Sequence, residues 1–298
     1  MKFGVCLPNY GLKFDEEGFL NFARRVEELG FHSVWTTDHI LMPEGSGTPY
    51  ERILDSITSL AAVTTVTRKV RLGISSLVMA MRNPVIVAKQ LCTIDRLSGG
   101  RVVLATGAGW NEKEFRHLGA DFHRRGKVLD ESISIIRLMW GSKGNPFSYV
   151  GDHIPIKIER GIFSPPPVQN NLEIWIAGTS SHAMRRAAKL GDAWHPNLQP
   201  LEKFEQMVKE FRGYPGGDEK PVCIRCAYSS EFEKREYVSP QGERRIVLSK
   251  DMNQNKALLN EVERMGVSYA VLATDPFGKV DFSNQLNDLE RFSSQFVD

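Results

Sequence analysis

The chain has 298 residues, of which 41% are hydrophobic and 25% charged, so a globular core is expected. The formal net charge is only +2 and no basic run stands out, which argues against a nucleic-acid or membrane-surface partner. No apolar run approaches the roughly 20 residues of a membrane-spanning helix, and the first residues lack the features of a signal peptide, so we expect a cytoplasmic protein.

Strand-like and helix-like segments alternate along the chain. The strand-like segments are short and apolar, at 2–7, 33–36, 70–75, 101–105, 172–177, 192–194, 222–227 and 269–273. Apolar residues at helical spacing predict helices at 19–29, 53–66, 84–97, 124–140, 181–190, 202–211, 257–265 and 282–296. Strict alternation implies a parallel sheet with helices outside it, and eight units in a chain of this length predict a closed (β/α)8 TIM barrel.

Two regions do not fit the repeat. Residues 141–171 hold short strand-like pieces around Gly151 before three consecutive prolines, which predicts an inserted hairpin. Residues 231–251 are charged and contain Pro240-Gln241-Gly242, which is typical of a second hairpin or a mobile loop. No domain boundary is visible, so residues 1–298 are predicted to form a single barrel domain.

The cysteines and histidines give little support to redox or metal chemistry. Cys223 and Cys226 form a CxxC, but on a strand this spacing directs the two thiols to opposite faces, so two buried thiols are the preferred interpretation. The seven histidines show neither HxH nor HExxH spacing, so we predict no metal site.

Polar, glycine and aromatic residues gather at the carboxyl ends of the predicted strands, where barrel enzymes place their chemistry. The strand ends carry Asn9 and Tyr10, Asp38 and His39, Ser75 and Ser76, Gly107 to Trp110, Gly178 to Ser180, and His195 with Asn197. This rim suits a large, planar ligand that bears a phosphate.

The glycine pair in ATGAGWNEKEF, at residues 105–115, is not a dinucleotide fingerprint. It lacks the third glycine of G-x-G-x-x-G and belongs to the fourth unit rather than the first. Gly107, Ala108, Gly109 and Trp110 instead suit a flat ring system packed on the backbone. Asn111 and Glu114 have the spacing of a capping box, which favours a structural role for Glu114.

Several spaced motifs together resemble the luciferase-like monooxygenase superfamily, and in particular its branch of F420-dependent (deazaflavin) oxidoreductases. The motifs are LPNYG, WTTDHILMP, RNPVIVAKQLCTIDRLSGGR, ATGAGWNEKEF with FHRRGKVLDE, and AGTSSHAMRRAAKLGDAWHP, in this order within residues 1–200. The resemblance implies the same barrel fold, a flavin-type cofactor, a small-molecule substrate and a homodimer.

The resemblance also implies roles for individual residues. His39 matches the histidine beside the reactive face of the cofactor, and its ordinary pKa suits proton transfer. Asp38 would orient His39 or hydrogen-bond the ring; otherwise it caps the segment that follows. Ser75-Ser76 corresponds to a non-proline cis peptide that presses against the ring, with a plain strand end as the alternative.

The cofactor phosphate of relatives corresponds to Ala177, Gly178, Thr179 and Ser180, where free N–H groups begin a helix. Ser180 as a simple N-cap is the structural alternative. Arg124 and Arg125 could reach a phosphate or a polyglutamate tail, or simply begin a solvated helix.

The predicted activity is F420-dependent hydride transfer to or from a small organic substrate. The first alternative is an FMN-dependent monooxygenase that uses oxygen, and an alternative of another class is a non-catalytic flavin-binding protein. A sugar-phosphate lyase or isomerase is disfavoured because few lysines or carboxylates stand at the strand ends. The sugar-phosphate dehydrogenase of this family has a glutamate where Trp110 stands and a tryptophan near the place of Pro43, so its chemistry is not carried over.

Overall fold

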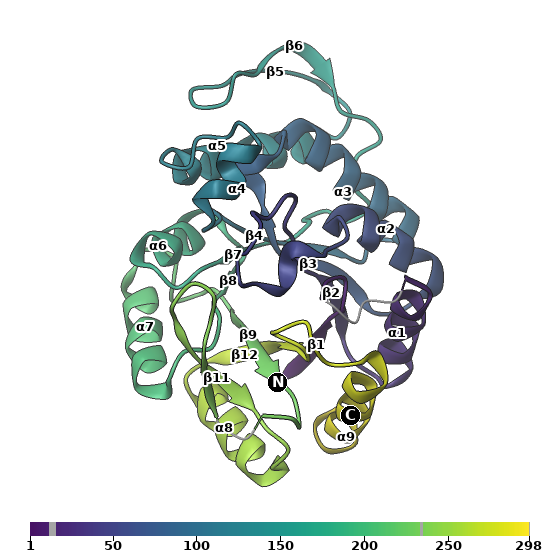
Figure 1. The fold of residues 1–298 in the computed structure, drawn as a ribbon. Helices are drawn as coiled ribbons and strands as arrows, with labels where there is room; N and C mark the ends of the chain where they lie inside the picture. The colour runs from purple at the N-terminus through teal and green to yellow at the C-terminus, as the bar shows by residue number, and fades with distance from the viewer. Residues whose placement is uncertain (12–15, 233–234, 298) are drawn as a thin grey trace.

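The computed structural model describes residues 1–11, 16–232 and 235–297, and in it eight parallel strands close into a barrel (Figure 1). Each strand pairs in parallel with the next, and the last pairs with the first through Lys2 and Tyr269. In order around the barrel the strands are β1 (Lys2–Cys6), β2 (Ser33–Thr36), β3 (Arg71–Val78), β4 (Val102–Gly107), β7 (Ile174–Ala177), β8 (Ala193–His195), β9 (Val222–Tyr228) and β12 (Val267–Ala273). The predicted (β/α)8 barrel is confirmed.

The longer helices form an outer ring around the strands (Figure 1). They are α1 (Glu16–Glu28), α2 (Ser56–Val66), α3 (Pro84–Ser98), α5 (Arg125–Gly141), α6 (Ser181–Leu190), α7 (Leu201–Gly213), α8 (Met252–Arg264) and α9 (Phe282–Phe296). Side-chain caps begin several of them, including Asp55 before α2 and Asn83 before α3. The short helix α4 (Glu112–His117) and the 3-10 turns η1 (Pro49–Glu51) and η2 (Met79–Met81) are too short to give a periodic signal in the sequence.

The apolar core has two parts. The larger part lies between the strands and the helices, and the smaller part fills the barrel interior with residues that include Trp35, Trp175 and Tyr269. Cys223 belongs to the inner part and Cys226 to the outer part, and both are free and buried. The two thiols of the CxxC therefore face opposite sides of β9, as the strand period requires.

Two hairpins interrupt the βα repeat. The antiparallel pair β5 (Pro146–Val150) and β6 (Lys157–Ile162) projects beyond α5 (Figure 1). The second hairpin pairs β10 (Glu236–Val238) with β11 (Arg244–Leu248), and β11 also runs parallel to the end of β9. This second hairpin therefore lies against the barrel and brings its side chains to the carboxyl ends of the strands.

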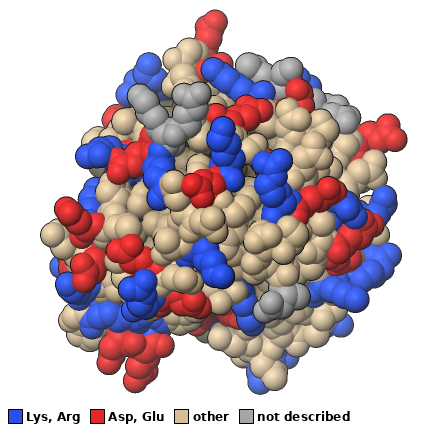
Figure 2. All heavy atoms as spheres, turned by 90° about the horizontal axis from the view of Figure 1, so that it is seen from below, with Lys and Arg blue, Asp and Glu red and all other residues tan. Residues whose placement is uncertain are grey.

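Figure 2 shows acidic and basic side chains interspersed over one face of the molecule, with no field of a single sign on that face. None of the helices in the described part of the chain is both long enough and apolar enough to cross a membrane.

Candidate active site

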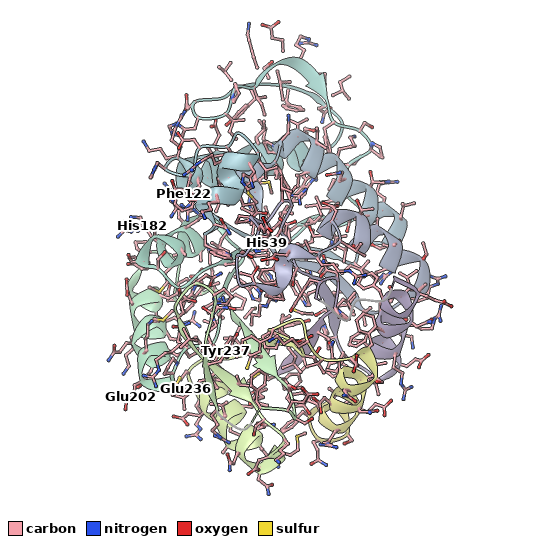
Figure 3. All side chains as sticks on the ribbon, in the orientation of Figure 1. His39, Phe122, His182, Glu202, Glu236 and Tyr237 are labelled. Atoms are coloured by element: carbon pink, nitrogen blue, oxygen red, sulfur yellow. The ribbon has the colours of Figure 1, made fainter. Side chains whose placement is uncertain are left out.

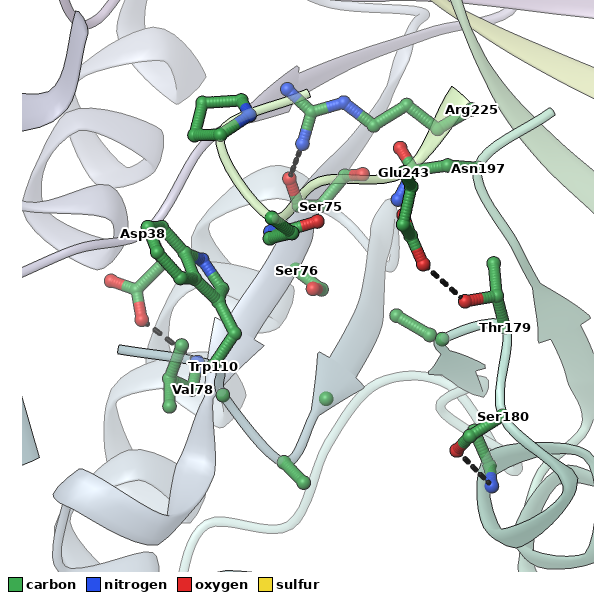
Figure 4. A pocket seen from close by; sticks show the side chains of 18 of the residues that line it. Asp38, Ser75, Ser76, Val78, Trp110, Thr179, Ser180, Asn197, Arg225 and Glu243 are labelled. Carbon is green, nitrogen blue, oxygen red and sulfur yellow. Dashed lines mark hydrogen bonds between the residues drawn. The ribbon is translucent and has the colours of Figure 1, made fainter. Parts of the chain in front are cut away.

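A cavity of about 680 Å³ opens at the carboxyl ends of the strands. This volume lies within the roughly 300–1,000 Å³ typical of ligand and cofactor pockets. All the residues predicted for the site line it: Asp38, His39, Ser75, Ser76, Gly107, Ala108, Gly109, Trp110, Ala177, Gly178, Thr179 and Ser180. The fold thus brings together residues from the ends of four strands, β2, β3, β4 and β7, in one concave site, part of which Figure 4 shows.

His39 is held by a buried carboxylate. Its Nδ1 lies 2.7 Å from Oε2 of Glu114, and both side chains are almost fully buried. The other Glu114 oxygen accepts the backbone N–H groups of Ile40 at 2.7 Å and Leu41 at 3.3 Å. Burial by itself would raise the pKa of Glu114, but the hydrogen bonds outweigh it and lower this pKa. The group is therefore a carboxylate that acts only as an acceptor.

This contact fixes the orientation of the imidazole. Because Glu114 accepts from Nδ1, Nε2 is the nitrogen left for a ligand, and no hydrogen bond to it is formed by the described residues. The imidazole ring stacks on Tyr50, with ring centroids 4.6 Å apart. It forms a T-shaped contact with Trp110, with centroids 5.8 Å apart. His39 lies near the centre of the barrel mouth (Figure 3).

Glu114 is the main correction to the sequence interpretation. Asn111 does cap α4, since its side-chain oxygen accepts from the N–H groups of Lys113 and Glu114. However, the Glu114 carboxylate bonds to His39 and not back to the cap. A partner 75 positions away in sequence has no local signal, so spacing alone suggested only the cap.

Asp38 does not orient His39. One of its oxygens accepts from Ser56 at 2.7 Å and Arg82 at 2.6 Å, and the other accepts from the N–H of Val78 at 2.9 Å. These bonds tie the end of β2 to α2, β3 and the loop before α3. Glu114 occupies the orienting position that we expected of Asp38, and Asp38 supports the cavity wall.

The peptide between Ser75 and Ser76 is cis, as the family resemblance implied. The Ser75 hydroxyl lies 2.8 Å from Nε2 of His195, whose Nδ1 lies 2.5 Å from the carbonyl oxygen of Cys223. Burial lowers the pKa of His195 to about 4, so its ring is neutral; Nδ1–H donates to the carbonyl and Nε2 accepts from the hydroxyl. His195 is therefore a support beneath Ser75 and not a proton donor in the cavity.

The glycine loops on two sides of the cavity allow close approach to the backbone. Gly109 has φ +85°, and a Cβ there would lie 2.6 Å from Cγ1 of Val78. Gly178 has φ +125°, and its Cβ would lie 2.8 Å from Cβ of Ala183. A side chain at either position would strain the loop that shapes the cavity.

The Gly178–Ser180 loop begins α6, and Ser180 caps it by accepting from the N–H of Ala183 at 3.3 Å. The hydroxyl of Thr179 donates to Oε1 of Glu243 at 2.6 Å. Glu243 and Arg245, which pair at 2.7 Å, come from the β10–β11 hairpin. The Ser180 cap is present, and Ser180, His182 and Ala183 at the start of α6 line the same cavity.

Basic side chains stand near this loop. Arg125 at the start of α5 lines the cavity and donates to the carbonyls of Gly109 and Phe122, whereas Arg124 contacts His153 instead. His123, His182 and Arg186 also line the cavity.

Several lining residues were not predicted as site residues. Arg225 on β9 is a charged residue within an otherwise apolar strand, which is a signal that the sequence did offer. Tyr50, Tyr237, Glu243 and Arg245 lie in loops or in the second hairpin, and only the closure of the fold brings them to the cavity. Tyr237 projects from β10 toward the barrel mouth (Figure 3).

The residues present fit a flavin or deazaflavin. The glycine loops and Trp110 leave room for a flat ring, His39 offers Nε2 beside it, and the start of α6 with Arg125 suits a phosphate. Among the described residues, no three His, Cys, Asp or Glu side chains gather in a way that could hold a metal ion.

Comparison with known proteins places this site in context. A family model described as luciferase-like monooxygenase matches residues 1–231. An F420-dependent glucose-6-phosphate dehydrogenase from Amycolatopsis mediterranei (strain U-32) is 30% identical over 188 residues, which cover 61% of this chain and 54% of that protein. The match thus spans about half the length of that dehydrogenase.

Solved structures share the fold at low identity. An F420-dependent secondary alcohol dehydrogenase, in complex with an F420–acetone adduct, has a TM-score of 0.76 and 18% identity over 97% of each chain. The oxygenating constituent of 3,6-diketocamphane monooxygenase from the CAM plasmid of Pseudomonas putida, in complex with FMN, has a TM-score of 0.74 and 14% identity over 100% of this chain and 98% of that one. These two likenesses establish the barrel architecture.

Proposed function

The chain belongs to the luciferase-like monooxygenase family, and we propose that it is an oxidoreductase that uses coenzyme F420 for hydride transfer to or from a small organic substrate. The observation that carries the proposal is the His39–Glu114 pair, which leaves an imidazole nitrogen beside a cavity of cofactor size. When bound, a flavin or deazaflavin supplies the hydride chemistry that no protein side chain provides.

His39 would hold or accept a proton at Nε2. A carboxylate behind Nδ1 keeps this tautomer and stabilises the imidazolium that forms when Nε2 takes up a proton. Tyr50 and Trp110 flank the ring and limit the access of water to it. The catalytic side chain is therefore oriented before any ligand binds.

The remaining predicted residues would bind and position the cofactor. The bulge at Ser75-Ser76 and the backbone of Gly107 to Gly109 would contact the ring, and Gly178 to Ser180 with Arg125 would bind its phosphate. We also propose a homodimer, as the family resemblance implies, and a cytoplasmic location, as the sequence indicates.

The choice of F420 over FMN is supported by the dehydrogenase relative and by the motifs that resemble the deazaflavin branch. The basic side chains beside α6, among them Arg125 and His182, would also suit the acidic tail of F420. Glucose 6-phosphate is not proposed as substrate, because Trp110 stands where the related dehydrogenase has its glutamate.

An equilibrium titration of the purified apoprotein with F420 and, separately, with FMN tests the proposal, with tryptophan fluorescence as the readout. Trp110 lines the cavity, so binding should quench its emission. We expect micromolar or tighter binding of F420 and weak binding of FMN, and the Arg125→Gln variant should weaken F420 binding. Failure of both cofactors to bind would refute the proposal.

The second candidate is an FMN-dependent monooxygenase, favoured by the shared fold of the FMN-bound diketocamphane enzyme. It predicts the opposite preference in the titration, together with oxygen uptake when a reductase and FMN are supplied. Tight binding of either cofactor without turnover across a broad substrate panel would instead favour a non-catalytic flavin-binding protein.

A further inference from the structure

Arg225 is an unusual residue for the interior of a barrel. It is the charged residue in the middle of β9, whose sequence is VCIRCAY. Cys223, two positions earlier, packs in the barrel interior, so the strand period directs Arg225 to the same side. Its side chain lines the cavity, and Figure 4 shows it beside Ser75 and well separated from Ser180.

Among the described residues, the guanidinium of Arg225 has only neutral hydrogen-bond partners. One nitrogen donates to the carbonyl oxygen of Ser75 at 2.6 Å and another donates to the hydroxyl of Thr37 at 3.1 Å. A guanidinium has five N–H donors, of which these bonds use two, so three remain. Within the described part of the chain, no carboxylate forms an ion pair with Arg225.

The other arginines that line the cavity differ from Arg225. Arg186 pairs with Asp130 and Arg245 pairs with Glu243. Arg125 also lacks a carboxylate partner in the part of the chain that the structure describes, but its guanidinium lies over the ring of Phe122, 3.8 Å from the centroid, at the α6 end of the cavity. Arg225 instead lies on the side of the cavity that Thr37, Tyr50 and His39 line.

The acidic groups around Arg225 do not neutralise it. Burial raises the pKa of the Cys6 thiol and of the Tyr10 and Tyr237 phenols, so these three groups are protonated at neutral pH. A partly buried charge without a counter-ion is costly, and the remaining N–H donors match the two oxygens of a carboxylate. The cavity therefore contains a place for an anion that none of the described acidic side chains fills.

We infer that Arg225 binds an anionic oxygen group of the substrate, so that the substrate of this enzyme is a small organic acid held on the His39 side of the cavity. The inference rests on the proposed function for the reaction, and it adds the class of substrate. The same donors could instead face a carbonyl group of the cofactor ring, and the experiment below separates the two.

The test uses benzoate and its neutral isostere benzamide as probes on the whole protein, with and without F420. Binding of each is measured by isothermal titration calorimetry to the wild type, Arg225→Gln, Arg225→Lys and Arg125→Gln. We expect the wild type to bind benzoate at least ~tenfold more tightly than benzamide, because the charge-assisted hydrogen bonds require the carboxylate. Arg225→Gln should abolish this preference, Arg225→Lys should keep part of it, and Arg125→Gln should leave it unchanged.

If the inference holds, the two arginine substitutions affect F420 binding in the opposite way to benzoate binding. Arg125→Gln should weaken F420 binding, whereas Arg225→Gln should change it by less than ~threefold. Equal binding of the two probes to the wild type would overturn the inference, as would a preference that survives in Arg225→Gln or disappears in Arg125→Gln. A large loss of F420 affinity in Arg225→Gln would assign the arginine to the cofactor and overturn the inference as well.

The design separates this inference from the proposed function. If neither F420 nor FMN binds but the benzoate preference depends on Arg225, the proposed function fails while the anion site stands. If Arg225→Gln does not fold, the preference in the wild type and its partial retention in Arg225→Lys still decide the question.

Discussion

Replacing Glu114 by Gln removes the negative charge of the side chain but keeps its size and shape. In the wild type both oxygens accept, one from His39 and the other from the N–H groups of Ile40 and Leu41. An amide has one accepting oxygen and one donating NH2 group, so its oxygen can accept from Ile40 and Leu41 only while its NH2 donates to Nδ1 of His39, which moves the imidazole proton to Nε2. Because Glu114 is 1% exposed, weaker neutral hydrogen bonds then replace charge-assisted ones at a buried position. We expect a loss of about 1–3 kcal/mol in the free energy of unfolding.

The matched control is Glu112→Gln in the same helix. Glu112 forms only an exposed pair with Arg116 at 3.5 Å, so its change should cost less than about 0.5 kcal/mol. In a thermal melt the Glu114 variant should unfold roughly 2–8 °C earlier than the wild type, and the Glu112 variant should stay within about 1–2 °C of it. Equal stability of the two variants would refute the reasoning.

The stability that Glu114→Gln removes depends on pH in a definite direction. The folded protein lowers the pKa of Glu114 below its ordinary value of 4.5, so the carboxylate stabilises the fold at neutral pH. That stabilisation is complete above the pKa of the unfolded chain and is lost as the pH falls through the lower pKa of the folded state. The difference in melting temperature between wild type and Glu114→Gln should shrink as the pH falls below about 4.5. A difference that grows below that pH would contradict the assignment.

Three further changes probe the site and the core. His39→Ala should reduce kcat by roughly 10²–10⁴-fold while the dissociation constant of F420 changes little, as measured by steady-state kinetics and fluorescence titration; unchanged turnover would remove His39 from the mechanism. Glu243→Gln should tighten F420 binding by about fivefold, because it removes a negative charge that holds Thr179 at the proposed phosphate site, and weaker binding in the same titration would contradict this placement. Phe292→Ala should lower the free energy of unfolding, measured by urea denaturation, by about 3–5 kcal/mol, because the ring is fully buried and its centroid lies 5.1 Å from that of Phe3. The control Leu97→Ala should be nearly neutral, because Leu97 is 74% exposed.

The architecture was readable from the sequence because it rests on local patterns. The strand at 33–36 and the helices at 181–190 and 282–296 are found at their predicted bounds, and the caps Asn83 and Ser180 begin helices as their residue types indicate. Hydrophobic periodicity, caps and glycines act over a few residues, so one chain segment contains the whole signal. The alternation of eight such units then leaves few arrangements other than a barrel.

The positions of the rim residues were also readable, since the carboxyl ends of parallel strands meet at one end of a barrel. What the sequence could not assign is how those residues pair. Spacing suggested a cap for Glu114, and the family resemblance left Asp38 to orient His39 or to bond the cofactor ring. The structure instead joins Glu114 to His39 and surrounds Asp38 with Ser56, Val78 and Arg82.

The sequence by itself thus determined the strands and helices of the barrel and the residues at four strand ends that line the cavity. Only the tertiary structure decided that no carboxylate of residues 1–11, 16–232 and 235–297 pairs with Arg225 and that the β10–β11 hairpin brings Glu243 to Thr179. The physical reason is that hydrogen bonds and ion pairs depend on distances of about 3 Å between groups that lie far apart in sequence. Those distances exist only after the barrel has closed.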